Sequence, residues 1–113
     1  MSSPLTSHVL DTALGRPARG IAVLVERSTG DDWTLLARGT TNDDGRVPDL
    51  LSPGAFDVGT YRVTFLTGPY LEAQGNPAFY PHVTVVFRVD APDEHYHIPL
   101  LLSPFGYSTY RGS

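Results

Sequence analysis

Apolar and polar residues alternate with a period of two through much of this sequence. In GIAVLVER (20–27), every second residue from Ile21 to Val25 is apolar and β-branched. The same alternation recurs in TYRVTFLT (60–67) and HVTVVFRV (82–89), which are rich in β-branched and aromatic residues. Because successive side chains of a strand point to opposite faces, this pattern predicts strands that each bury one face.

Turn sequences rich in Gly, Pro and Asp separate these segments. They include STGDD, which precedes a further expected strand in WTLLAR (33–38), and TNDDG, LSPGAFDVG and DAPDE. Helical character is confined to PYLEAQGN (69–76), about two turns long and opened by Pro69. Short strands at regular spacing with turns between them are typical of an all-β sandwich or barrel.

The last strand pair is expected within EHYHIPLLLSPFGYSTY (94–110). Alternation would place His95 and His97 on one face of the first of these strands. Pro99 and Pro104 lack a backbone N–H group, which favours an edge position or a bend at those two points.

Length and composition exclude several classes of protein. The 113 residues suit one domain, 1–113, and 41% hydrophobic with 18% charged residues are typical of a globular chain. The apolar stretches are far shorter than the ~20 residues that span a bilayer, and no secretory signal pattern is present, so a cytoplasmic location is expected. A net charge of −4 with scattered arginines argues against nucleic acid as a partner.

Histidines are the main reactive groups of a chain that contains neither Cys nor Lys. The four are His8, His82, His95 and His97, and imidazole is the side chain that titrates near neutral pH without perturbation. The two in HYH could bind zinc only with a third ligand from a distant segment such as His8. A zinc site therefore stays open beside the simpler reading of surface or hydrogen-bonded histidines.

Two long segments at opposite ends of the sequence carry a family resemblance. HVLDTALGRPARGIAV (8–23) combines a basic residue, two aliphatic residues, Asp and a Gly-x-Pro-Ala step into an aliphatic strand. With AFYPHVTVVF (78–87) and YHIPLLLSPFGYS (96–108), it resembles the transthyretin-like family over almost the whole chain. The resemblance implies a β-sandwich of two sheets, with about eight strands and one short helix. It also implies that the first strand lies between the strand of Arg46 and that of His97.

A few positions separate two branches of that family. The hormone-carrier transthyretins have Lys, Glu and Thr at the positions that match His8, Arg46 and His97, and their last strand continues differently. This sequence instead has the His, Arg and His, and the closing YRGS (110–113), of the enzyme branch, which hydrolyses 5-hydroxyisourate. The resemblance thus implies a hydrolase of urate degradation, with a small-molecule carrier without catalysis as the alternative.

The resemblance implies a catalytic group of three residues. His97 is expected to act as a general base on water, with His8 as its partner or proton relay. Arg46 is expected to hold anionic oxygens of the substrate and to stabilise charge in the transition state. A nearby Arg cation should also lower the pKa of an imidazole. His95 and His82 stay outside the predicted site.

The closing residues are expected to wall the substrate pocket: Tyr110, Arg111, Gly112 and Ser113. The implied product is 2-oxo-4-hydroxy-4-carboxy-5-ureidoimidazoline, formed by opening the six-membered ring at its lactam carbonyl. This chemistry requires no metal and no organic cofactor. The family also implies a homotetramer, a dimer of dimers formed by edge strands, with sites between subunits and no membrane partner.

Overall fold

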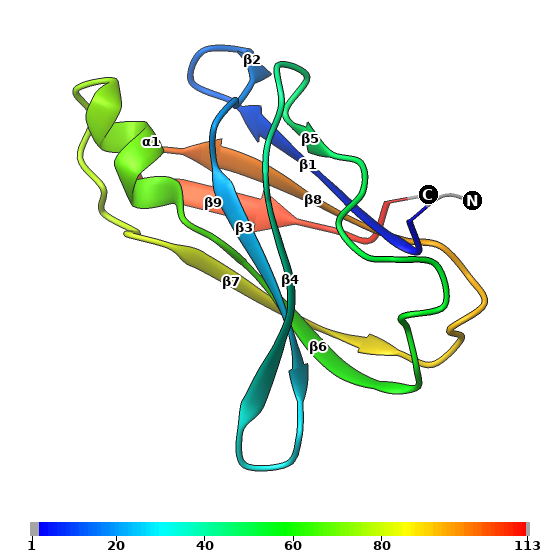
Figure 1. Cartoon of the computed structure of the whole chain (residues 1–113). Helices are drawn as coiled ribbons and strands as arrows, with labels where there is room; N and C mark the ends of the chain where they lie inside the picture. Colours follow the sequence, from blue (N-terminus) through cyan, green and yellow to red (C-terminus); the bar gives the residue numbers. More distant parts are fainter. Residues whose placement is uncertain (1–2, 113) are drawn as a thin grey trace.

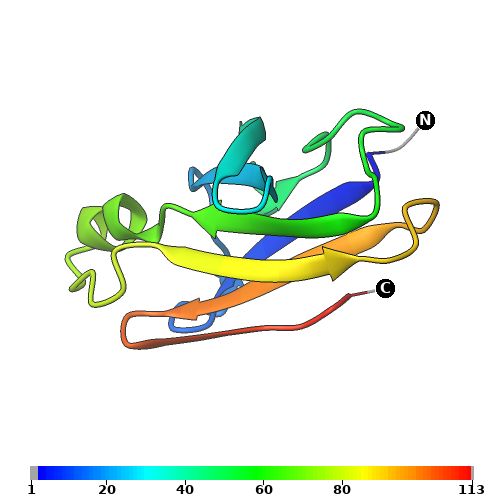
Figure 2. The same cartoon turned by 90° about the horizontal axis from the view of Figure 1, so that it is seen from below.

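Two β-sheets packed face to face form the body of the protein, as Figures 1 and 2 show. The computed structural model describes residues 3–112. The first sheet contains β1 (Leu5–Asp11), β2 (Arg16–Pro17), β5 (Arg46–Val47), β8 (Tyr96–Ser103) and β9 (Gly106–Thr109). The second contains β3 (Ala22–Ser28), β4 (Trp33–Thr40), β6 (Gly59–Phe65) and β7 (Val83–Val89).

The expected all-β sandwich of two sheets is confirmed. The described residues form nine strands where the sequence predicted about eight, because β2 and β5 are pairings of only two residues each. The strands expected at 20–27, 33–38, 60–67 and 82–89 correspond to β3, β4, β6 and β7, and the last strand pair expected within 94–110 corresponds to β8 and β9. The sequence therefore located each end of these four strands of the second sheet to within about two residues.

The first sheet is organised around a parallel pair of strands from the two ends of the chain. Its strand order is β2-β1-β8-β9, and β5 pairs with β1 along the edge that β2 also uses. β1 and β8 run parallel over seven residue pairs, from Leu5 opposite Tyr96 to Asp11 opposite Leu102. Parallel strands need a crossover connection, and here the second sheet and the helix lie between them in the chain. β1 thus lies between the strands of Arg46 and His97, as the resemblance implied.

The inward faces of the two sheets form an apolar core. In β1 the buried positions alternate strictly with half-buried ones, from Leu5 to Asp11, and β6 buries Tyr61, Val63 and Phe65 in the same way. Each fully buried aliphatic or aromatic side chain contributes about 1.5–3 kcal/mol of transfer free energy. The outward positions of the first sheet do not contribute to this core, which leaves that face for other roles.

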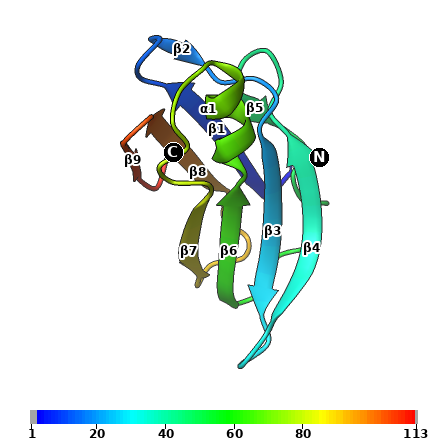
Figure 3. The same ribbon diagram turned by 90° about the vertical axis from the view of Figure 1, so that its left-hand side faces the viewer.

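The helix α1 (Thr67–Ala73) covers one end of the sandwich, close to the end of β1 (Figure 3). It begins two residues before the expected Pro69, where the Gly68 N–H donates to the Pro81 carbonyl over 2.9 Å. The Tyr70 hydroxyl donates to Asp11 Oδ2 over 2.7 Å, and burial followed by this bond raises the pKa of Tyr70. No helix within residues 3–112 is long and apolar enough to cross a membrane.

The sequence favoured an edge position or a bend at Pro99. The structure places Pro99 inside β8, with β1 on one side and β9 on the other, so the edge position was wrong. The ladder with β9 begins at Leu100, opposite Thr109, so the side of Pro99 that lacks an N–H group faces β9 just beyond the ladder. The Pro99 carbonyl on that side accepts a hydrogen bond from the Thr109 hydroxyl at 2.7 Å. Pro104 lies in the turn between β8 and β9, as expected of a bend.

We expect Gly45→Ala to destabilise the fold by about 3 kcal/mol or more. Gly45 has φ +74°, and an added Cβ would collide with the Val9 carbonyl oxygen. Gly54→Ala is the matched control, because Gly54 has φ +81° with nothing within 4 Å of its added Cβ. It should cost only the backbone term of about 1–2 kcal/mol. Urea unfolding measures both, and equal losses would contradict the steric argument.

Candidate active site

The outward face of the first sheet brings His8, Arg46 and His97 together from three strands. β1 presents His8 on this face, because Ser7 and Val9 on either side of it are buried. β5 pairs with β1 so that Arg46 lies opposite His8, and β8 pairs with β1 so that His97 lies opposite Thr6. Residues directly opposite one another in paired strands share a face. The three residues of the expected catalytic group therefore share one surface.

A tight turn before β5 positions Arg46. Asn42 Oδ1 accepts hydrogen bonds from the N–H groups of Asp44 at 2.9 Å and Arg46 at 3.0 Å, and the Asn42 N–H donates to the Arg46 carbonyl over 2.9 Å. The side chain of Arg46 is exposed, and no Asp or Glu within residues 3–112 pairs with it. An exposed guanidinium without a carboxylate partner can bind the oxygens of an anion.

The ring of His97 is half-buried and held by a hydrogen bond. Its Nδ1 lies 2.8 Å from Thr6 Oγ1. Burial lowers the pKa of His97 most, and the positive charges of Arg46, His95 and His8 lower it further. The effect of Arg46 was expected from the sequence, whereas the larger effect of burial was not. A lowered pKa keeps the imidazole neutral, and so able to accept a proton, at neutral pH.

Gly112 lies directly against His97. The Gly112 N–H donates to the His97 carbonyl over 2.9 Å and forms an isolated β-bridge with it. A Cβ at position 112 would lie 2.5 Å from Cδ2 of the His97 ring, so a glycine is required for this close approach. Tyr110, two residues earlier, follows the end of β9 and is 58% exposed. The pairing register of β8 with β9 continues to the bridge between His97 and Gly112, so Tyr110 and Gly112 lie on the same side of this segment. Ser113 lies outside the described residues.

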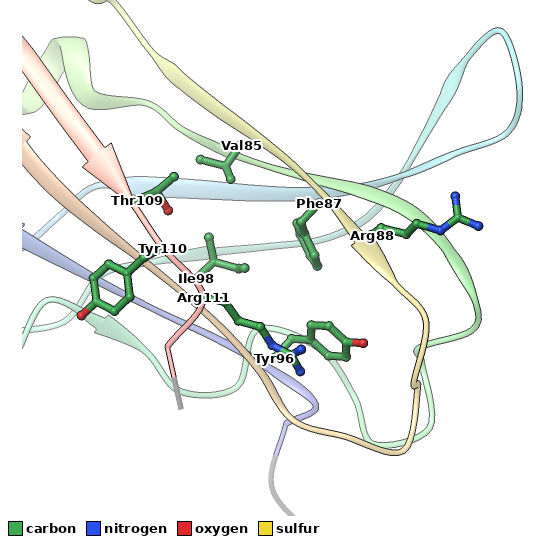
Figure 4. Close-up of a pocket in the computed structure, with 8 residues that line it drawn as sticks. All are labelled: Val85, Phe87, Arg88, Tyr96, Ile98, Thr109, Tyr110 and Arg111. Carbon is green, nitrogen blue, oxygen red and sulfur yellow. The ribbon is translucent and has the colours of Figure 1, made fainter.

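Arg111 does not join this group in the single chain. Its guanidinium lies over the Tyr96 ring, 4.2 Å from the centroid, and donates to Glu94 Oε1 over 3.1 Å. Tyr96 is on the core side of β8, so the side chain of Arg111 lies on the core side of the sheet, opposite to the face that carries His97. Figure 4 shows Arg111 against Tyr96, with Tyr110 directed away from both.

The residues around Arg111 line an open pocket of about 230 Å³ beside β7 and β8 (Figure 4). Its lining consists of Val85, Phe87, Arg88, Tyr96, Ile98, Thr109, Tyr110 and Arg111. None of His8, Arg46 and His97 contributes to it. This mainly apolar pocket therefore shares only Tyr110 with the side of the chain on which the imidazoles and Arg46 gather.

Thr6 is a residue of this surface that sequence reasoning missed. Its hydroxyl lies 2.8 Å from His97 Nδ1 and also 2.8 Å from His95 Nε2. The sequence held a partial signal, because Thr6 lies two residues before His8 and so shares its face. Its contact with His95 and His97 depends on the register of β1 and β8, which the sequence does not specify. His82 is exposed just before β7, in the other sheet.

The zinc interpretation of HYH gains no support from this arrangement. His95 Nδ1 lies 3.1 Å from the Ser3 carbonyl oxygen, and its Nε2 is bonded to Thr6. In the part of the chain that the structure describes, no three or more His, Asp and Glu side chains group closely enough to hold a metal ion.

Comparison with known proteins distinguishes between the two branches. Residues 5–112 match the HIUase/Transthyretin family. The chain is 47% identical over 114 residues to 5-hydroxyisourate hydrolase of Mus musculus, covering 99% of this chain and 97% of that one. Its fold is similar to sea bream transthyretin in complex with thyroxine, with a TM-score of 0.91, 38% identity, and coverage of 96% and 94%. It is also similar to 5-hydroxyisourate hydrolase of Klebsiella pneumoniae, with a TM-score of 0.85, 34% identity and full coverage of both chains.

The chain belongs to the HIUase/transthyretin family. Relatives that are 46–50% identical over almost the whole chain are 5-hydroxyisourate hydrolases, which places the chain in the enzymatic branch of that family. It is an enzyme, a hydrolase.

We expect Gly112→Ala to reduce activity while the sandwich stays folded, because the new methyl group would displace the His97 ring. If His97 has the catalytic role expected from the sequence, displacing its ring should lower activity by about 10-fold or more. Gly106→Ala is the matched control, since its Cβ would meet only Ser103 Oγ at 3.6 Å, an ordinary contact. Steady-state kinetics with circular dichroism of both variants test this, and full activity of Gly112→Ala would contradict it.

The lowered pKa of His97 predicts how stability depends on pH. The unfolded chain should titrate this residue near pH 6.5. At that pH and somewhat below it, the folded state therefore binds fewer protons than the unfolded state. The free energy of unfolding should therefore decrease as the pH falls through about 6.5 and level off below the folded pKa. Urea unfolding across this range should show a smaller decrease for His97→Asn than for the control His82→Asn. An unchanged pH dependence in His97→Asn would contradict the assignment.

Proposed function

We propose that this enzyme hydrolyses 5-hydroxyisourate to 2-oxo-4-hydroxy-4-carboxy-5-ureidoimidazoline, a step of urate degradation. The observation that carries the proposal is the gathering of His8, Arg46 and His97 on one face of the first sheet. Relatives that are 47% and 50% identical over almost the full length of both chains are 5-hydroxyisourate hydrolases, from mouse and Rhizobium meliloti. The substrate is inferred from these two findings together.

His97 is the proposed general base. Its neutral imidazole takes a proton from water as the water oxygen adds to the lactam carbonyl carbon of the substrate. When the ring carbon–nitrogen bond breaks, the imidazolium returns the proton to the leaving nitrogen, and a carboxylic acid and a free ureido group result; the acid then releases its proton to solvent and becomes a carboxylate. The lowered pKa of His97 supports this role, because the base must be unprotonated before each turnover.

Arg46 and His8 are proposed to act on the charge of the reaction. Negative charge develops on the carbonyl oxygen when water attacks, and a cation fixed beside it stabilises the transition state more than the ground state. The guanidinium of Arg46 has no carboxylate partner within residues 3–112 and lies opposite His8 in the sheet. His8, the nearest outward neighbour of Arg46, is proposed to assist the proton transfers.

The C-terminal residues are proposed to wall the substrate site. Gly112 lets the backbone lie against His97, and Tyr110 is on the same side of that segment. Ser113 is proposed as a substrate contact from the sequence resemblance alone. Arg111 would contribute indirectly, because its contacts with Tyr96 and Glu94 fix the segment that carries Gly112.

A homotetramer, built as a dimer of dimers, is also proposed. The surface of His8, Arg46 and His97 lies on the outward face of one sheet rather than in an enclosed pocket of the chain. A second copy packed on this face would exclude water from it, which strengthens electrostatic catalysis. β7 and β9 end their sheets and offer free edges for the pairing of chains. The cytoplasmic location stays a prediction from the sequence.

The carrier without catalysis that the sequence left as the alternative shares this fold, because the chain matches sea bream transthyretin as well as a hydrolase, so the backbone alone does not test the activity. The decisive measurement follows the ultraviolet decay of freshly generated 5-hydroxyisourate with and without the protein. We expect a large acceleration over spontaneous decay, with a loss of about 10²–10⁴-fold in His97→Ala and about 10²–10³-fold in Arg46→Ala.

Arg38→Ala is a matched control for Arg46→Ala, because Arg38 is an exposed arginine of β4 in the other sheet. Its activity should equal that of the unmodified enzyme, and treatment with a chelator should leave the rate unchanged. A decay rate equal to the spontaneous rate would refute the hydrolase and favour a carrier. Activity lost on chelation and restored by zinc would instead assign a metal site.

A further inference from the structure

A single hydroxyl group links the two histidines of HYH. Thr6 Oγ1 lies 2.8 Å from His95 Nε2 and 2.8 Å from His97 Nδ1. The two imidazoles lie with their ring planes 20° apart and their centroids 6.5 Å apart. A hydroxyl has one proton, so it can donate to one of these nitrogens and must accept from the other.

The other end of this chain of hydrogen bonds determines its direction. His95 Nδ1 lies 3.1 Å from the carbonyl oxygen of Ser3. A carbonyl oxygen can only accept, so His95 must carry a proton on Nδ1. In the neutral imidazole the other nitrogen then has the lone pair, and Nε2 of His95 accepts the proton of the Thr6 hydroxyl.

The orientation of the Thr6 hydroxyl in turn fixes the tautomer of His97. Because the proton of Thr6 points to His95, its oxygen must accept from His97, and His97 carries its proton on Nδ1. The lone pair of neutral His97 is then on Nε2, the nitrogen that has no hydrogen bond to Thr6.

We propose that Thr6 and His95 are positioning residues that hold neutral His97 in the tautomer with its lone pair on Nε2. This inference rests on the proposed function, in which His97 accepts a proton from water. It explains why HYH contains two histidines on one face although the first is not needed at the reacting atoms. It also assigns the base among the two candidate histidines, since His8 has no such chain within the described residues.

The Thr6 hydroxyl donates to His95 and accepts from His97 only while His95 is neutral. A proton added to His95 Nε2 would make that nitrogen a donor to Thr6, so the hydroxyl would donate to His97 Nδ1 and the lone pair on Nε2 would be lost. The charged and titratable groups that face the two rings include His8 and Arg46 from the neighbouring strands. Asp93 and Glu94 line a pocket together with His95.

The proton balance of a turnover is consistent with this arrangement. When His97 Nε2 takes the proton of the attacking water, its Nδ1 proton stays bonded to Thr6, whose oxygen is an acceptor for either form of the ring. The same proton leaves from Nε2 to the leaving nitrogen. The series of hydrogen bonds from Ser3 through His95 and Thr6 to His97 therefore needs no rearrangement during the reaction. It limits the His97 ring to one productive orientation.

Nuclear magnetic resonance tests the proposal without reference to catalysis. In the protein labelled with ¹⁵N-histidine, long-range proton–nitrogen correlations at a pH above the titration of the rings distinguish the two tautomers, and His97→Asn assigns the signal. We expect neutral His97 to be protonated on Nδ1. In Thr6→Val, an isosteric change that removes the hydroxyl, the proton should move to Nε2, which free histidine favours. His95→Phe should have the same effect, since Thr6 can then donate to His97.

Kinetics test the consequence. Thr6→Val and His95→Phe are expected to lower kcat by about 10–100-fold, the range for partners that orient a functional imidazole, with little change in KM. Thr6→Ser keeps the hydroxyl and should restore most of the activity. Thr64→Val is the matched control, because it removes a hydroxyl bonded to Thr84 in the other sheet, and it should leave kcat unchanged.

A proton on Nε2 of neutral His97 in the unmodified protein would overturn the proposal. So would a Thr6→Val variant with an unchanged tautomer, or one with full kcat. If the unmodified protein does not accelerate the decay of 5-hydroxyisourate, the proposed function fails. The tautomer of His97 would still be decided by the nitrogen signals, so the two failures can be distinguished.

Discussion

The parallel pairing of β1 with β8 is the constraint on which the rest of the molecule depends. It joins the two ends of the chain over seven residue pairs and sets residues 91 positions apart, such as Thr6 and His97, opposite each other. β5 adds to one edge of β1 and β9 to the other edge of β8. A shift of this register by one residue would turn His97 into the core and Tyr96 outward, so the buried side of β8 also fixes the functional side.

The proposed site lies on strands, which give it a rigid support. The inward neighbours of His8 and His97 are core residues such as Val9 and Ile98, which hold the strands in place by packing. Only Arg46 depends on a turn, and there the Asn42 side chain and the tight backbone of Gly45 fix the entry into β5. The precision that a proton transfer requires is thus supplied by the sheet and its core.

The same sandwich is found in a thyroxine-binding transthyretin and in a hydrolase, with TM-scores of 0.91 and 0.85. The backbone therefore does not decide between a carrier and an enzyme. In the function proposed above, the difference lies in a few outward side chains of one sheet. A half-buried imidazole with a lowered pKa, a guanidinium nearby and a second imidazole form a group that can move a proton and stabilise an anion.

The sequence by itself determined the all-β class, six of the strands (β3, β4, β6, β7, β8 and β9) and the buried face of those with clear alternation, because period-two alternation and turn residues act locally. It also supplied His8, Arg46 and His97 through their resemblance to a known pattern. Tertiary structure decided which residues meet: Thr6 with His95 and His97, Gly112 against the His97 ring, and Arg111 against Tyr96. These contacts depend on the register of strands far apart in the chain, and on burial, which no local pattern encodes.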